Sequence, residues 1–194
     1  MTFVVCDTLP MLWLILGVAA LVIVLFVVYL FNRLVRLRNE VDTGWANIDV
    51  QLKRRNDLIP NLVETVKGYA AHERGVFEEV TEARAAVGRA STPATAGAAD
   101  SLLGQALGRL FAVAEAYPDL KASENFRQLQ GELTDTEDKI AAARRYYNAT
   151  VLAYNTATQT FPSLLVAGVG GFGAREFFAA EQDERAPVEV SFRS

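Results

Sequence analysis

The sequence predicts an all-α protein, with an N-terminal transmembrane helix followed by an elongated up-and-down helical bundle. Two observations predict this fold. Residues 11–31 form an unbroken apolar run, and after them apolar residues recur at intervals of three and four. Such intervals place side chains on one face of a helix, and no segment shows the alternation typical of strands. We therefore divide the chain into a short extracytoplasmic N-terminus (1–10), a transmembrane helix (11–31), a helical bundle (32–180) and a flexible C-terminal tail (181–194).

The apolar run, MLWLILGVAALVIVLFVVYLF, contains no charged or amide side chain. At the rise of an α-helix it spans about 31 Å, the thickness of a membrane's hydrocarbon core. Trp13 and Tyr29 lie near its two ends, where interfacial aromatic residues are common. A cleaved signal peptide would need a basic segment before a shorter apolar run, but residues 1–10 contain no Lys or Arg. We therefore expect an uncleaved single-pass membrane anchor.

Basic residues follow the span but do not precede it. Arg33, Arg36 and Arg38 come directly after it, and residues 53–55 add three more positive charges. Because basic residues near a span favour the cytoplasmic side, we expect the N-terminus outside the cell and the C-terminal domain in the cytoplasm.

The composition excludes several classes of function. The formal net charge is -4, so no overall positive field favours nucleic acid. Cys6 is the only cysteine and His72 the only histidine, which leaves too few ligands for a typical zinc site. Residues 168–173 fit the dinucleotide pattern G-x-G-x-x-G, but a helix and a proline precede them rather than a strand. We therefore predict no cofactor, no metal and no nucleic-acid partner.

The first helix after the span is predicted to continue from the transmembrane helix without a break and to end near Gly88. Its apolar stripe comprises Leu34, Leu37, Val41, Trp45, Ile48, Leu52, Ile59, Leu62, Val66, Tyr69, Phe77, Val80 and Val87. Pro60 removes one helical hydrogen bond and should kink the helix. At about 85 Å this helix is longer than its partners. It therefore bends or breaks near Pro60 or Gly75, or its ends protrude and bind another molecule.

Two further helices complete the predicted bundle. After a loop at 88–97, the second covers residues 98–117 and ends before Pro118, because a residue that precedes proline disfavours helix. The third begins near Ser123, a suitable N-cap, and closes at Pro162. Beyond it, a short helix at one or both ends of residues 162–182 is compatible with the glycines between them.

These helices resemble the LemA family of bacterial membrane proteins. The first matching blocks read WANIDVQLKRR (45–55) and DLIPNLV (57–63), and Gly68-Tyr69 follows. The match continues in the third helix through residues 126–133, Glu137, Ile140, 143–144, 147–148, 154–155 and 161–162. The resemblance implies a helical bundle behind one transmembrane helix in the bacterial inner membrane. It implies no particular reaction and no catalytic residues.

Charged side chains interrupt the apolar stripes. Arg55 fills the gap between Leu52 and Ile59, while Glu137 and Arg144 fill gaps in the stripe of the third helix. A buried charge without a partner costs several kcal/mol, so these groups should be paired or line a wet groove. One interpretation is an ion pair that sets the register of the bundle, and the other is a polar site for a ligand or partner peptide.

Asparagines on the same helices are candidate interhelical hydrogen-bonding groups, namely Asn47, Asn56, Asn61, Asn148 and Asn155. The candidate interhelical polar or partner site therefore comprises Arg55, Asn56, Asn61, Glu137, Arg144, Tyr147 and Asn148.

No catalytic constellation accompanies this site, so we predict a non-enzymatic scaffold or adaptor that presents helical surfaces to protein partners or to further copies of itself. The alternative is a membrane-tethered sensor that recognises a small ligand or peptide in the polar groove.

Overall fold

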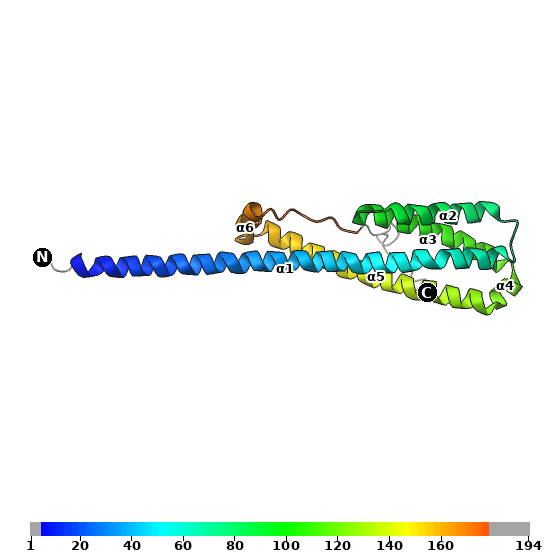
Figure 1. The fold of residues 1–194 in the computed structure, drawn as a ribbon, viewed down its shortest axis with the longest axis horizontal. Coiled ribbons are helices and arrows are strands. Elements are labelled where there is room, and N and C mark those ends of the chain that lie inside the picture. The colour runs from blue at the N-terminus through cyan, green and yellow to red at the C-terminus, as the bar shows by residue number, and fades with distance from the viewer. Residues whose placement is uncertain (1–4, 179–194) are drawn as a thin grey trace, which may run out of the picture. The chain divides into compact units, whose positions relative to one another are not determined.

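The computed structural model describes residues 5–178, with side chains from residue 11 onward. Residues 1–4 and 179–194, which include the predicted tail, lie outside the described residues. The described range is helical and contains no strand (Figure 1), and its helices are α1 (Val5–Lys67), α2 (Arg74–Arg89), α3 (Pro93–Glu115), α4 (Pro118–Ala122), α5 (Glu124–Gln159) and α6 (Ser163–Gly170). The predicted all-α fold, with a long apolar N-terminal helix followed by a helical bundle, is therefore confirmed.

The chain forms two compact units, and the two long helices contribute to both. The anchor unit comprises the described residues up to Val41 together with Leu152–Arg175. The bundle unit comprises Asp42–Val151 together with the described residues from Glu176 onward.

α1 continues from the apolar run into the polar part of the chain without a break, as predicted. Side chains of residues 11–31 are exposed except for Leu30, and Trp13 is 71% exposed. Each large apolar side chain left in water forgoes about 1.5–3 kcal/mol of burial, so this surface favours lipid. Among the described helices, α1 alone is long and apolar enough to cross a membrane, and it carries one candidate span.

The first helix ends at Lys67, so its predicted end near Gly88 is wrong. The backbone N–H groups of Tyr69 and Ala70 both donate to the Val66 carbonyl, at 3.0 and 2.9 Å, and the chain leaves the helix in a turn. Pro60 lies inside α1 and does not end it. The break is thus nearer to Gly75 than to Pro60, the two positions that the sequence suggested.

The predicted stripe is divided between two helices that pack together. Phe77 and Val80 lie on α2 and are buried in the same core as residues of α1. Arg84 Nε on α2 donates to the Asn56 carbonyl of α1 at 3.2 Å. By turning after Lys67, the chain lets one half of the stripe cover the other, which a single helix could not do.

α3 begins at Pro93, five residues before the predicted start at Ala98. Thr92 caps it: its side chain accepts from the Thr95 N–H at 3.2 Å, and the Thr92 N–H donates to Thr95 Oγ1 at 3.0 Å. Proline at the first helical position has no N–H to leave unsatisfied. The predicted loop at 88–97 is therefore mostly helix. The single turn α4, which follows Tyr117, was not predicted.

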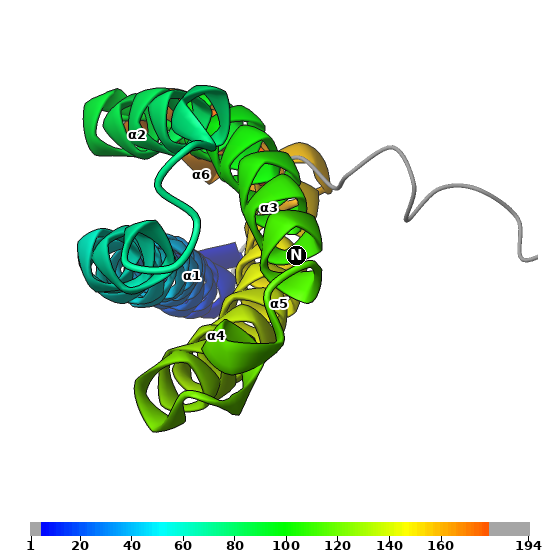
Figure 2. The ribbon, with the colours of Figure 1, turned by 90° about the vertical axis from the view of Figure 1, so that its right-hand side faces the viewer.

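The core of the bundle unit is built by α2, α3, α4 and the adjoining parts of α1 and α5. Figures 1 and 2 show these parts of the four longer helices side by side. Its buried side chains include Ile59, Leu62, Val66, Phe77, Val80, Leu103, Leu110, Leu120, Phe126 and Leu133. An exposed ion pair between Arg109 Nη1 and Glu79 Oε1, at 2.8 Å, joins α3 to α2.

α1 and α5 approach closely at Gly44. A Cβ atom added there would lie 3.3 Å from the Tyr147 Cα and 3.5 Å from Thr150 Oγ1. Glycine therefore allows the two backbones to cross where a larger side chain would separate them.

In the anchor unit, α6 and the residues after it pack on α1. The left-handed Gly171, with φ of 69°, ends α6. The Phe172 ring then makes an edge contact with Phe31, with ring centroids 5.4 Å apart, and Arg38 lies over the same ring at 5.3 Å.

Candidate functional site

The buried charge of Arg55 is paired within the bundle unit. Its Nη1 lies 2.7 Å from Asp100 Oδ1 on α3 and 2.8 Å from Glu137 Oε2 on α5. Arg55 and Asp100 are 7% and 5% exposed, whereas the Glu137 side chain is 48% exposed. The guanidinium thus joins three helices, and of its two carboxylate partners Glu137 is the one open to solvent. Removing the buried Asp100 would leave a poorly compensated charge between the helices, whereas Glu137 is partly screened by solvent.

Asp100 was missed by the sequence analysis. It follows Ala96 by four residues and precedes Leu103 by three, so it occupies the buried face of α3. Extending that face toward the helix start would have shown an acidic residue among apolar ones. The predicted helix over residues 98–117 contains Asp100, but its apolar face was followed only from Leu103 onward.

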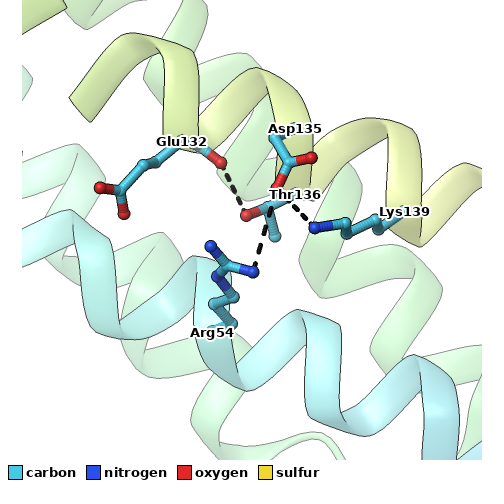
Figure 3. Close-up of polar contacts among 5 residues, drawn as sticks. All are labelled: Arg54, Glu132, Asp135, Thr136 and Lys139. Carbon is cyan, nitrogen blue, oxygen red and sulfur yellow. Dashed lines mark hydrogen bonds and ion pairs between the residues drawn. The ribbon is translucent and has the colours of Figure 1, made fainter. Parts of the chain in front are cut away.

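Close to this ion pair, α1 and α5 share a second, exposed set of charges (Figure 3). Arg54 Nη1 lies 3.9 Å from Asp135 Oδ2, and Lys139 Nζ donates to the same oxygen at 2.7 Å. The hydrogen bond from Lys139, with the positive charges of Lys139 and Arg54, holds the pKa of Asp135 below its ordinary value despite an opposing effect of desolvation. The buried Thr136 hydroxyl is satisfied within α5, because it donates to the Glu132 carbonyl at 2.7 Å.

Tyr147, Asn148 and Arg144 form a separate group around the extended residues 176–178. The Tyr147 hydroxyl donates to the Glu176 carbonyl at 2.8 Å. The Asn148 amide pairs with both backbone groups of Phe178, donating to its carbonyl at 3.2 Å and accepting from its N–H at 2.9 Å. Arg144 lies over the Phe178 ring, 5.1 Å from its centroid.

Phe178 also fills an aromatic pocket. Its ring centroid lies 6.5 Å from that of Trp45, which in turn lies 6.0 Å from Tyr147. Phe178 is 2% exposed. The group therefore attaches residues 176–178 to α1 and α5.

In the anchor unit, a second asparagine pairs with a backbone in the same way as Asn148. We call these two pairings the asparagine clamps. Asn155 Nδ2 donates to the Arg175 carbonyl at 2.8 Å, and Asn155 Oδ1 accepts from the Arg175 N–H at 2.8 Å. Asn148 and Asn155 were predicted to bond neighbouring helices. Instead, these contacts join each of them to an extended segment, because an amide side chain presents the same donor and acceptor pair as a strand.

Asn56 and Asn61 lie apart from both groups. Asn61 is exposed, and its carbonyl accepts from Thr65 Oγ1 at 2.7 Å. Asn56 Oδ1 is buried and has no hydrogen-bond partner among the described residues. Asn56 lines a cleft of about 210 Å³ together with Trp45, Asp49 and Lys53. The structure thus divides the seven predicted site residues. One group holds Arg55 and Glu137, and the other holds Arg144, Tyr147 and Asn148. Asn56 and Asn61 each lie separately.

The described residues offer little for metal or nucleotide chemistry. Across residues 11–178, no group of three His, Cys, Asp or Glu side chains could hold a metal ion. His72 is exposed in the turn between α1 and α2. The glycine-rich residues 168–173 form the end of α6 and the turn after it, where no strand precedes them.

The chain is similar to several known proteins. It is 27% identical over 204 residues to magnetosome protein MamQ of Magnetospirillum gryphiswaldense, with 90% of this chain and 75% of that protein covered. It is 26% identical over 200 residues to magnetosome protein MamQ 2 of Paramagnetospirillum magneticum, with 90% and 73% covered. Protein LemA of Metamycoplasma hominis is 29% identical over 161 residues, with 82% and 74% covered.

The comparison with family models matches the same helices in which the sequence resembles the LemA family. The model of the LemA family matches residues 44–192, which include the second part of α1 and all of α2 to α6. Because this match takes in most of a helical chain with one candidate span, the chain belongs to the LemA family of membrane-associated helical proteins.

Proposed function

We propose that the protein is a non-enzymatic scaffold or adaptor, which a membrane holds through α1 and which presents helical faces of the bundle unit to protein partners. The observation that carries this proposal is the continuity of α1. One unbroken helix includes both the exposed apolar run and core residues such as Ile59 and Leu62. α1 therefore contributes residues both to the candidate span and to the core of the bundle unit.

The polar side chains of the candidate site support a structural role over catalysis. Arg55 is held by Asp100 and Glu137, and the Asn148 amide is occupied by the backbone of Phe178. Catalytic groups need access to a substrate, whereas these groups stabilise the contacts between helices and the C-terminal segment.

A groove between α2 and α3 is the face that we propose for a partner helix. Leu102 is 54% exposed at this groove, and Ala83, Ala86 and Ala106 line it. Small residues let a second helix approach closely, and an exposed leucine supplies an apolar contact. Glu79, Glu82, Arg89 and Arg109 also line the groove and supply charges of both signs at its edges.

Photo-crosslinking in native membranes tests this function. A photoreactive residue at Leu102 should give a reproducible adduct with one protein or with a second copy of the chain. The same residue at Gln128, exposed and polar on α5, is the matched control and should give none. Deleting residues 1–32 should reduce the adduct. A protein that stays monomeric and uncrosslinked at both positions would contradict the proposal.

We place the bundle unit in the cytoplasm, because Arg33, Arg36 and Arg38 follow the span and no basic residue precedes it. In a Cys6→Ser background, Leu102→Cys should react with a membrane-impermeant maleimide only after cells are permeabilised. Labelling of intact cells would reverse this orientation.

A binding module is the second candidate, favoured by the unsatisfied Asn56 Oδ1 beside a cleft of about 210 Å³. Asp49 and Lys53 at this cleft could pair with the two charges of an amino acid. Free amino acids should then raise the melting temperature of the full chain, and Asn56→Leu should abolish the shift. If no amino acid raises it, this candidate is wrong.

A further inference from the structure

α6 and the residue preceding its proline cap expose an uncharged apolar surface. Residues 161–170 contain no charged side chain, and Phe161, Leu165 and Val169 are 80%, 63% and 96% exposed. Leu165 and Val169 lie four residues apart on one face of α6, whereas Ser163 and Ala167 are buried. A helix on the surface of a soluble protein has the opposite arrangement, with large apolar residues facing inward. This face therefore needs an apolar cover.

The same segment contacts α1 at the end of the apolar run. Phe31, the last residue of that run, packs against Phe172, and a Cβ atom on Gly170 would lie 3.4 Å from Phe31 Cε2. Arg38 lies over the Phe172 ring, 5.3 Å from its centroid. All of these residues belong to the anchor unit, in which Figure 1 draws α6 beside α1. α6 is thus placed where the candidate span gives way to its first arginines.

We propose that the exposed face of α6, together with Phe161, inserts into the lipid leaflet that α1 leaves at Phe31. α6 would then be a second, shallow membrane contact of the protein. The proposal rests on α1 crossing the membrane and adds to it a lipid-binding role for α6. Leu164, 48% exposed, contributes to the same apolar surface.

Three features favour lipid over a protein as the cover. The surface adjoins the candidate span, so any bilayer that encloses residues 11–31 ends close to α6. Residues 161–174 contain no charge that would oppose insertion. Arg33 and Arg36, both exposed and within about one and a half turns of the apolar run, can reach lipid phosphates at the same level.

Depth-dependent fluorescence quenching tests the proposal with the full chain. Single cysteines at Leu165, Val169, Leu21 and Val50, each in a Cys6→Ser background, are labelled with an environment-sensitive dye. The labelled proteins are reconstituted into vesicles of phosphatidylcholine and phosphatidylglycerol that carry a spin label either near the headgroup end of the acyl chain or near its methyl end. Leu21 lies in the middle of the apolar run and reports on the deep label, and Val50 is an apolar residue of comparable exposure in the bundle unit.

We expect blue-shifted emission and lipid quenching at Leu165 and Val169, together with protection from aqueous iodide, and neither effect at Val50. If Leu21 is quenched while Leu165 and Val169 are open to iodide, the inference fails and the anchor stands. If Leu21 is not quenched, the anchor itself fails. Protection of Leu165 that grows with protein-to-lipid ratio without lipid quenching would identify a second copy as the cover and overturn the proposal.

A charged variant provides an independent check. Leu165→Asp combined with Val169→Asp should remove the lipid quenching of a dye at Phe161→Cys. Because both side chains are exposed, the variant should melt at the same temperature as its parent in detergent. Unchanged quenching in this variant would contradict insertion of α6.

Discussion

A single buried arginine organises the polar interior of the bundle unit. Taking a guanidinium out of water is unfavourable unless carboxylates replace the lost hydration, and Arg55 has Asp100 and Glu137 within 2.8 Å. The sequence predicted that Arg55 and Glu137 face neighbouring helices, because both interrupt apolar stripes. Spacing could place Asp100 on the buried face of the second helix, but it could not identify Asp100 as the partner of Arg55, since partner choice depends on how helices are placed.

The two carboxylates should contribute unequally to stability. Asp100→Asn removes the buried charge and should lower the free energy of unfolding by about 2–4 kcal/mol. Glu137→Gln is the matched control and should cost about 1 kcal/mol or less, because its side chain is half-exposed. Chemical denaturation of the full chain in detergent measures both. A larger loss for Glu137→Gln would contradict the assignment of Asp100 as the main partner.

The lowered pKa of the exposed Asp135 predicts how the stability of the folded state depends on pH. Because its pKa is lowered in the folded protein, ionised Asp135 favours the folded state above the carboxyl's unfolded pKa, and this contribution is lost as pH falls through the folded pKa. Lys139→Gln removes the principal cause and should raise the pKa of Asp135. Carbon-detected NMR titration of the carboxyl measures it. An unchanged pKa in Lys139→Gln would show that the Lys139 hydrogen bond does not persist in solution.

At the scale of helices, periodicity predicted the elements better than their ends. The stripe through Val66 and Phe77 keeps its spacing across the turn after Lys67, so the sequence showed one helix where there are two. The break has no proline, and it depends on packing between α1 and α2. The start of α3, by contrast, depends on neighbouring residues alone, because Thr92-Pro93 is a typical helix beginning. It could have been predicted but was missed.

Gly44 tests the close contact between α1 and α5. A glycine inside a helix costs about 1 kcal/mol relative to alanine, so Gly131→Ala, with open space around it, should stabilise the protein by that amount. Gly44→Ala should fail to give this gain, and Gly44→Leu should destabilise by more than about 2 kcal/mol, because the Tyr147 backbone is 3.3 Å away. Thermal and chemical denaturation compare the three. Equal gains at both glycines would exclude the close crossing.

The asparagine clamps should act independently of each other. Asn148→Ala removes both side-chain partners of the Phe178 backbone, so exchange of the Phe178 amide hydrogen should accelerate. The Arg175 amide should stay protected, because Asn155 holds it. Asn155→Ala should accelerate exchange of the Arg175 amide hydrogen and leave the Phe178 amide protected. Hydrogen exchange followed by NMR distinguishes the two sites, and acceleration of both amides in either variant would mean that the segment detaches as a whole.

At the scale of the whole molecule, the sequence predicted the all-α class, the candidate span and the family, because each depends on composition and on motifs along the chain. The predicted boundaries of the helical bundle, after residue 31 and after residue 180, stay a prediction. The contact of α6 with Phe31 could not be predicted from spacing. It joins residues far apart in the chain, and glycines at 170 and 171 allow it.

Anchoring of the bundle in a membrane by α1 is tested most directly by alkaline carbonate extraction of native membranes. Carbonate removes proteins that are bound only at the surface, including those held by a shallow contact such as the one proposed for α6. The full chain should remain in the membrane pellet, and a chain lacking residues 1–32 should be released into the supernatant. Release of the full chain would contradict the account.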